Sequence, residues 1–264
     1  MNRSTAWLLG AVVALAAVGY LVYRFLIGPA QAPDAEVVPP PPVVVEPEPV
    51  VEHPVPEIPV AEEPEPLPLL DQSDELVAQS LAEVTGEEPV EAFLVPGDVV
   101  RKTVATVDSL DAKKLFPRIR AVQPTEGDFV VENDGETIML GEENFKRYDR
   151  IVGTLEATST ERLADLYFRY YPLFQQAYVE LGYPSGYFND RLVEVIDHLL
   201  ATPDVSEPIR LEQPSVYYTF ADPDLEALSS GQKLLLRMGP QHRATVKQKL
   251  RDFRAVITER TATP

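Results

Sequence analysis

Residues 158–182 read TSTERLADLYFRYYPLFQQAYVELG and show the strongest helical periodicity in the chain. Apolar residues recur there at spacings of three and four, the repeat of one face of an α-helix; they are Leu163, Leu166, Tyr167, Tyr170, Phe174, Ala177, Tyr178 and Leu181. Thr158-x-x-Glu161 resembles a capping box at the start, and Gly182 can end the helix. Because Pro172 lacks an amide proton, we expect one helix with a kink near residues 168–172.

Other helices are predicted on both sides of this one. We expect them at residues 71–86, 98–110, 145–155, 189–200, after Asp222-Pro223, and at 229–238 and 240–259, with Asn189 capping the helix at 189–200. Around Asn133-Asp134-Gly135, the apolar runs FVV and TIML predict a small β-hairpin. Residues 209–220 are expected to form a short extended pair. The predicted fold class is therefore mainly α, with a small β-hairpin and one further short extended pair.

Composition divides the chain into three parts. The 264 residues are 45% hydrophobic and 25% charged, with 26 prolines and a net charge of -19. We predict an anchor at residues 1–28, a Pro/Glu-rich disordered stalk at 29–68, and one helical domain at 69–264 that is long enough for a hydrophobic core. The absence of cysteine excludes disulfides, thiolate metal sites and a cysteine nucleophile.

The anchor prediction rests on the run from Trp7 to Ile27, WLLGAVVALAAVGYLVYRFLI, whose only charge is Arg24. As a helix rising ~1.5 Å per residue, it can span the ~30 Å hydrocarbon core of a bilayer. A cleaved signal peptide is the alternative, because Ala30-Gln31-Ala32 imitates a cleavage pattern. The length of the run and Pro33 after the cut favour the uncleaved anchor.

Orientation depends on a small positive-inside bias. Arg3 and the terminal amine lie on one side of the run, and Arg24 lies on the other. No further Lys or Arg occurs before Arg101, so nothing positive in the stalk resists export. We expect the N-terminus in the cytoplasm and the domain in the periplasm.

The stalk is rich in proline and acid, including Pro39–Pro42 and several Glu-Pro pairs. Prolines remove amide donors and favour extended backbone, and the acids repel one another. We expect a solvated spacer that reaches at most ~120 Å at ~3.1 Å per residue. Docking of a Pro-rich motif onto a partner is the alternative.

One predicted helix carries several titratable residues on one face. Asp190, Glu194 and Asp197 follow one another at spacings of four and three, and His198 lies four residues after Glu194. Such a face could supply an acid and a base or ligate a metal. The alternative is a solvated face opposite the apolar one, which Arg191 beside the acids supports. Because the metal and nucleotide motifs are absent, we predict no metal and no cofactor.

Aromatic residues with polar tips gather in the middle of the domain. Their helical spacing is typical of core packing. The loop 182–189 is the best exception, because its glycines and proline can present Tyr183, Tyr187 and Phe188 to a partner or a sugar. These three residues are the candidate binding residues.

The last predicted helix is basic, although the chain as a whole is acidic. Residues 233–260 contain eight Lys and Arg, while Val246, Leu250, Phe253 and Ile257 form an apolar stripe. The acidic net charge opposes long-range attraction to nucleic acid, so we expect no nucleic-acid partner. We expect the basic face to pack against the acidic remainder.

Two long strings carry a resemblance to a known family. YPLFQQAYVELGYPSGYFNDRLVEVIDHLLATP (171–203) and QPSVYYTFADPDLEALSSGQKLLLRMGP (213–240) resemble the bacterial membrane-anchored proteins with domain of unknown function 3014. The resemblance runs from about Leu69 to Arg254 and includes the anchor and stalk. It implies a bacterial host and makes an envelope location more plausible, and it implies no reaction or ligand.

Three functional hypotheses follow. The leading one is a non-enzymatic binding or scaffolding module of the bacterial envelope, anchored in the inner membrane through Trp7–Ile27 and binding an envelope protein or glycan. The second is an envelope hydrolase that uses carboxylates of the 190–198 helix. The third is a membrane adaptor facing the cytoplasm. Carboxylates that converge in a concave pocket would favour the hydrolase.

Overall fold

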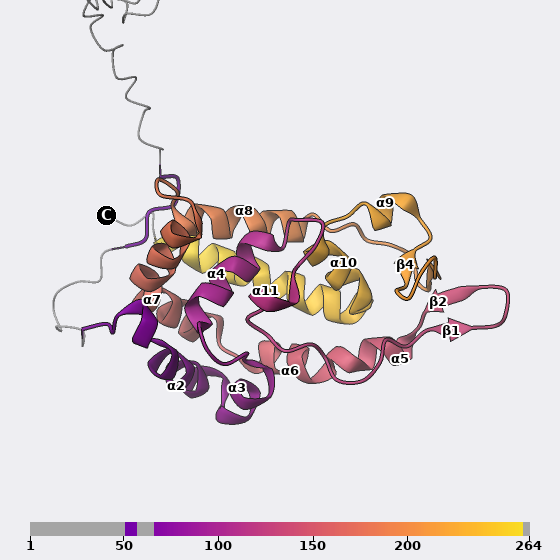
Figure 1. Ribbon diagram of the computed structural model, residues 1–264, viewed down its shortest axis with the longest axis horizontal. Coiled ribbons are helices and arrows are strands. Elements are labelled where there is room, and N and C mark those ends of the chain that lie inside the picture. Colours follow the sequence, from indigo (N-terminus) through magenta and orange to yellow (C-terminus); the bar gives the residue numbers. More distant parts are fainter. Residues whose placement is uncertain (1–50, 57–65, 261–264) are drawn as a thin grey trace, which may run out of the picture. The chain divides into compact units, whose positions relative to one another are not determined.

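The computed structural model describes residues 51–56 and 66–260. The predicted anchor, Trp7–Ile27, lies outside the described residues. Among the described residues, no helix is both long and apolar enough to cross a membrane. Figure 1 shows helices packed on one another, with a small sheet beyond the ends of α5 and α10.

The fold is mainly helical, as predicted. The helices are α2 Asp74–Thr85, α3 Glu87–Phe93, α4 Val99–Ser109, α5 Glu142–Phe145, α6 Asp149–Ala157, α7 Thr160–Leu181, α8 Phe188–Leu200, α9 Pro223–Glu226, α10 Ser230–Arg237 and α11 Pro240–Glu259. The strands are β1 Glu132–Asn133, β2 Ile138–Leu140, β3 Ile209–Glu212 and β4 Thr219–Phe220.

Helix α7 is continuous and lies at the centre of the main core. It contains Pro172 and packs against α4 and α11. Its start differs from the prediction, because the hydroxyl of Ser159, rather than Thr158, accepts the hydrogen bond from the backbone N–H of Arg162. Gly182 ends the helix at φ 123°, which favours glycine. One helix rather than two is thus confirmed, and the kink stays a prediction.

The main core joins α2, α4, α7, α8 and α11. Tyr170 is 1% exposed, and its hydroxyl lies 2.8 Å from the hydroxyl of Ser80, so the polar tip of the ring is satisfied inside the core. Ile257 of α11 is fully buried in the same core. The apolar stripe of the basic helix therefore faces inward, while Arg254 pairs with Asp197 on the surface. This arrangement confirms the expected packing of that helix.

The two predicted extended regions form one sheet. Four antiparallel strands follow the order β1-β2-β3-β4, because β2 pairs with β3 as well as with its hairpin partner β1. Leu140, Ile209, Leu211, Phe220 and Leu236 form a second core under this sheet. The hairpin turn has Gly135 at φ 93°, as the Asn-Asp-Gly sequence predicts. The separate pair of the prediction is thus the other half of the same sheet.

Two further differences concern local structure. Helix α3 was not predicted, and it has no buried residue. Asn189 was predicted to cap its helix, and this prediction was wrong: the cap residue is Tyr187, with no side-chain capping bond, and Asn189 lies within the first turn of α8. Its side chain has other partners, described below.

Candidate peptide-binding site

Residues 51–56, with the sequence VEHPVP, lie beside the start of α8 (Figure 1). They come from the predicted stalk, before the proposed domain boundary at residue 69. Four hydrogen bonds join their backbone to side chains at the start of α8. The side chain of Val55 also packs against the main core. Here the domain holds a proline-containing segment that has no regular secondary structure and bends at Glu52 and His53.

Asp190 holds the first half of this segment. One of its carboxylate oxygens accepts the backbone N–H of Glu52 at 3.0 Å, and the other accepts that of His53 at 2.6 Å. A carboxylate in the first turn of a helix is also stabilised by the positive end of the helix dipole. Hydrogen bonds to an ionised acceptor are stronger than neutral ones. Asp190 is therefore the principal acceptor of the site.

Asn189 binds the backbone carbonyl of His53. Its side-chain amide nitrogen donates to the carbonyl of His53 at 2.9 Å, while its amide oxygen accepts the hydroxyl proton of Tyr167 at 2.9 Å. Asn189 is 0% exposed. Because Tyr167 occupies the oxygen, the nitrogen of the amide is directed at the segment. Sequence reasoning missed this role.

Tyr187 completes the site. Its hydroxyl oxygen accepts the backbone N–H of Val55 at 2.6 Å. The other two residues, Pro54 and Pro56, have no backbone N–H to satisfy. Every described backbone donor of residues 52–55 therefore has a partner in the site.

Three side chains of α7, those of Gln175, Tyr171 and Tyr167, support the loop before α8 and the first turn of α8. Gln175 accepts the N–H of Phe188 at 2.8 Å and donates to the carbonyl of Gly186 at 2.8 Å. It also accepts the hydroxyl proton of Tyr171 at 3.0 Å. Burial raises the pKa of Tyr171 and that of Tyr167 well above the usual range, so both hydroxyls keep their protons and remain donors.

The other two candidate binding residues have different positions. Phe188 is 1% exposed and stacks on Phe174 in the main core, so its ring anchors the loop from within. Tyr183 is 42% exposed, stacks on Tyr178, and donates its hydroxyl proton to Asp108 at 3.2 Å. Of the three, only Tyr187 has a side-chain hydrogen bond to the described segment.

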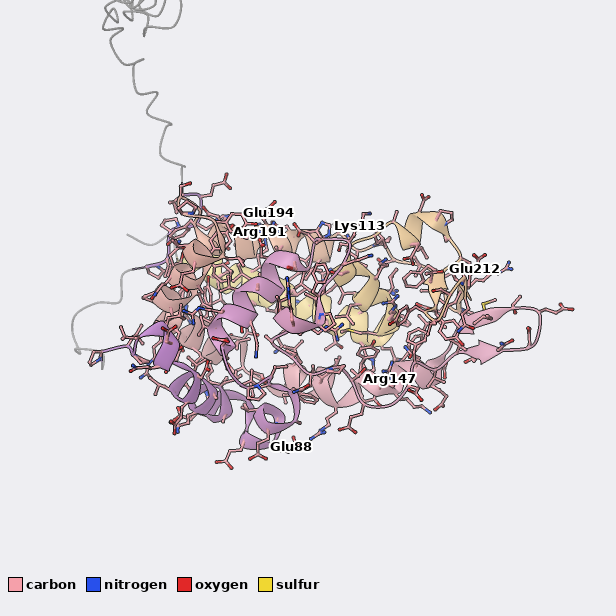
Figure 2. All side chains as sticks on the ribbon, in the orientation of Figure 1. Glu88, Lys113, Arg147, Arg191, Glu194 and Glu212 are labelled. Carbon is pink, nitrogen blue, oxygen red and sulfur yellow. The ribbon has the colours of Figure 1, made fainter. Side chains whose placement is uncertain are left out.

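The carboxylates of α8 do not converge. Glu194 pairs with Arg191, its neighbour in Figure 2, at 2.9 Å, and 69% of its side chain is exposed. Asp197 makes two hydrogen bonds to Arg254, at 2.6 and 2.8 Å. The His198 ring lies 2.9 Å from the hydroxyl of Ser229. Among the acidic residues and the histidine of α8, only Asp190 has a hydrogen bond to the segment. No group of three or more His, Asp or Glu among residues 51–56 and 66–260 could hold a metal.

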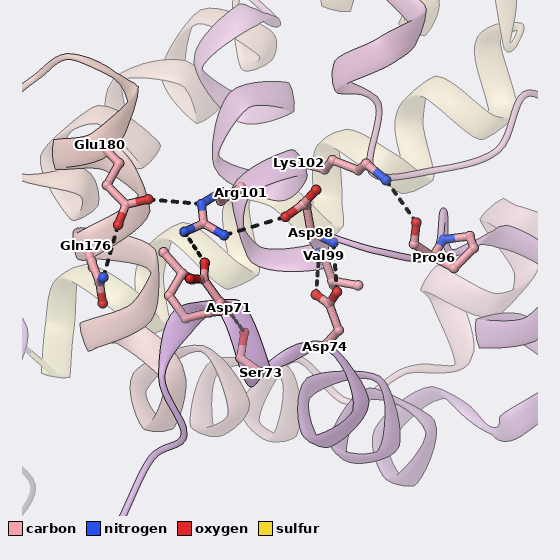
Figure 3. A network of polar contacts seen from close by, with 11 residues as sticks. Asp71, Ser73, Asp74, Pro96, Asp98, Val99, Arg101, Lys102, Gln176 and Glu180 are labelled. Carbon is pink, nitrogen blue, oxygen red and sulfur yellow. Dashed lines mark hydrogen bonds and ion pairs between the residues drawn. The ribbon is translucent and has the colours of Figure 1, made fainter.

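Two hollows lie elsewhere on the surface. The larger, of about 520 Å³, includes Glu207, whose buried carboxyl oxygens have no hydrogen-bond partner among the described residues. Its Oε1 lies 3.5 Å from Nη1 of Arg243. Burial raises the pKa of Glu207. The smaller, of about 400 Å³, is lined by Arg101, which Figure 3 shows bound to Asp71, Asp98 and Glu180. None of the α8 candidates lines either hollow.

The described part of the chain is thus a mainly helical domain with residues 51–56 seated at the start of one helix. Residues 99–254 match the family described as protein of unknown function (DUF3014), and the chain belongs to this family. The match begins at α4, later than the resemblance from Leu69 suggested. No curated protein and no solved structure matches the chain.

Proposed function

We propose that the protein is a non-enzymatic binding or scaffolding module whose domain binds proline-containing chain segments at the start of α8. The observation that carries the proposal is the set of four hydrogen bonds between the backbone of residues 52–55 and Asp190, Asn189 and Tyr187. Main-chain hydrogen bonds combined with one apolar contact are a common mode of peptide recognition.

The positions of the other candidate residues support binding over hydrolysis. A hydrolase of the kind considered above needs two carboxylates facing one substrate bond. Here Asp190 accepts backbone N–H groups, whereas Glu194 and Asp197 are paired with separate arginines at the surface. The arrangement can hold a chain segment, and no second carboxylate of α8 faces that segment.

The proposed setting is the bacterial inner membrane. In this proposal Trp7–Ile27 anchors the chain in the bilayer, the N-terminus is cytoplasmic, and the stalk carries the domain into the periplasm. An envelope protein or a glycan is the proposed partner. A Pro-rich segment that can extend from the membrane suits a module that must reach a partner.

The topology can be tested with reporter fusions. A periplasm-dependent reporter fused after Pro68 should be active, because the run at residues 7–27 is expected to stop in the membrane with its N-terminus inside. A cytoplasm-dependent reporter at the same position should be inactive. The reverse pair of results would place the domain in the cytoplasm and favour the adaptor.

Seating of the segment can be tested by proteolysis after Glu52. A glutamate-specific protease needs an extended, free backbone, so cleavage at Glu52 should report the released fraction. Asp190→Asn places an amide NH₂ where a carboxylate oxygen now accepts an N–H, and it should raise the cleavage rate about tenfold if most of the segment is seated.

Asp197→Asn is the matched control. It removes a carboxylate from the same helix that contacts Arg254 and not the segment. Its cleavage rate should equal that of the unchanged protein. Equal rates in all three proteins would mean that the segment is not held by Asp190, and the proposed function would lose its main support.

A further inference from the structure

We infer that the α8 site also binds proline-containing peptides supplied by another molecule, and that the chain's own residues 51–56 compete with them. This inference rests on the proposed function and adds a ligand class and a means of regulation. The site is already occupied by a segment of the same chain. Residues 57–65 link this segment covalently to the domain. A partner peptide must therefore displace that segment.

The contacts define the peptide that the site can hold. N–H donors are needed at the first, second and fourth residues, as in Glu52, His53 and Val55. The carbonyl of the second residue must face Asn189. Proline is accepted at the third position, because no donor is required there. An apolar side chain at the fourth position is favoured, since Val55 packs against the core.

The side chains at the first two positions are read less strictly. All four hydrogen bonds go to the backbone, and Glu52 is exposed. The ligand class is therefore a peptide of the form x-x-Pro-apolar, without proline at the first, second or fourth position, whose first two N–H groups both turn toward Asp190. Glu-x-Pro-Val is the version that the chain itself presents.

The Glu-x-Pro-Val pattern occurs three times in the sequence. Besides residues 52–55, it is found at 57–60 as Glu-Ile-Pro-Val and at 87–90 as Glu-Glu-Pro-Val. The last copy belongs to helix α3, so its backbone is not extended. The copy at 57–60 matches the seated one at every position that the site reads. A peptide with that sequence therefore tests the rule without copying the seated segment.

The effect of the tethered segment on the apparent affinity for a free peptide can be estimated. We take the effective concentration of the tethered segment to be on the order of 1 mM, the scale for a short tether. If a free peptide binds with a Kd of about 0.1 mM, the tethered segment weakens its apparent binding about tenfold. Removing the tethered competitor should restore the intrinsic affinity.

The experiment uses the full chain in detergent and two fluorescent peptides, PVVEHPVP (residues 49–56) and PVPEIPVA (residues 54–61). The competitor is removed by His53→Pro together with Ile58→Pro, which delete the second-position N–H from both stalk copies and change no residue of the folded core. Fluorescence anisotropy should show both peptides binding this variant about tenfold more tightly than they bind the unchanged chain. A PVVEPPVP peptide, which lacks the same N–H, should not bind.

The outcomes separate the two proposals. If proteolysis shows that the segment is seated in the unchanged chain and released in the double variant, yet neither peptide binds the variant, the inference is overturned and the proposed function stands. Equal binding of PVVEHPVP and PVVEPPVP would also overturn it, because the site would then not read the backbone. If the segment is not seated in the unchanged chain, the proposed function fails first.

Discussion

Replacing Arg191 with methionine should lower the free energy of unfolding by about 3 kcal/mol, because it leaves partly buried carboxylates without their cation. The guanidinium of Arg191 donates to the side chain and the carbonyl of Asp108 and to Asp111, each at 2.8 Å. The side chains of Arg191 and Asp108 are only 15% and 16% exposed. This arginine joins α8 to the end of α4, and urea denaturation of the purified protein measures the change.

Glu194→Gln is the control for this prediction. Glu194 also pairs with Arg191, but it is mostly exposed, so the change should cost less than about 0.5 kcal/mol. Arg191→Lys should fall between the two, because an ammonium cannot form the same set of hydrogen bonds. A loss for Glu194→Gln as large as that for Arg191→Met would show that the exposed pair, and not the link to α4, carries the stability.

Replacing Phe188 with alanine should cost about 3–5 kcal/mol of unfolding free energy, the range for deleting a buried phenylalanine ring. Phe188 is 1% exposed and packs against Phe174 and Tyr178. Its neighbour Tyr187 should behave differently. Tyr187→Phe removes only the hydroxyl that accepts the N–H of Val55, so the domain should lose about 1 kcal/mol or less.

The two variants distinguish a residue that stabilises the core from a residue that binds the segment. Phe188→Ala should lower the denaturation midpoint strongly, whereas Tyr187→Phe should leave it nearly unchanged and increase cleavage after Glu52. If Tyr187→Phe destabilised the domain as much as Phe188→Ala, both aromatic residues would be core residues. The assignment of Tyr187 to the binding site would then be wrong.

The sequence predicts the helices well where a single face is buried. Helix α11 begins and ends where its apolar stripe and Pro240 indicate, and α7 follows its aromatic repeat to Gly182. Helix α3 has no buried residue and contains Pro89, so no periodic signal marks it. The pairing of Ile138 with Leu211 could not be predicted either, because hairpin turns specify only their own two strands.

The candidate site could be predicted only in part. The glycines and aromatic residues of loop 182–189 indicate the region that contacts residues 51–56, and Asp190 is one of the carboxylates that the sequence singles out on α8. Sequence spacing cannot distinguish Phe188, which faces the core, from Tyr187, which faces the segment. It also assigned Asn189 to a capping role, because asparagine near a helix start usually caps.

No local sequence pattern predicts the contact between residues 51–56 and the start of α8. More than 130 positions separate Glu52, His53 and Val55 from their acceptors. Periodicity and turn chemistry report neighbours along the chain and are silent about such distant partners. The segment's composition indicates a spacer, which is how Pro- and Glu-rich sequences usually behave. Docking of a Pro-rich motif was the alternative, and here the motif docks onto its own domain.

Amide hydrogen exchange of the full chain reports whether residues 51–56 are held at the start of α8, as we claim. The amides of Glu52, His53 and Val55 should exchange about tenfold more slowly than in a free peptide of the same sequence, and Asp190→Asn should abolish most of this protection. Exchange at the free-peptide rate in the unchanged protein would contradict the claim.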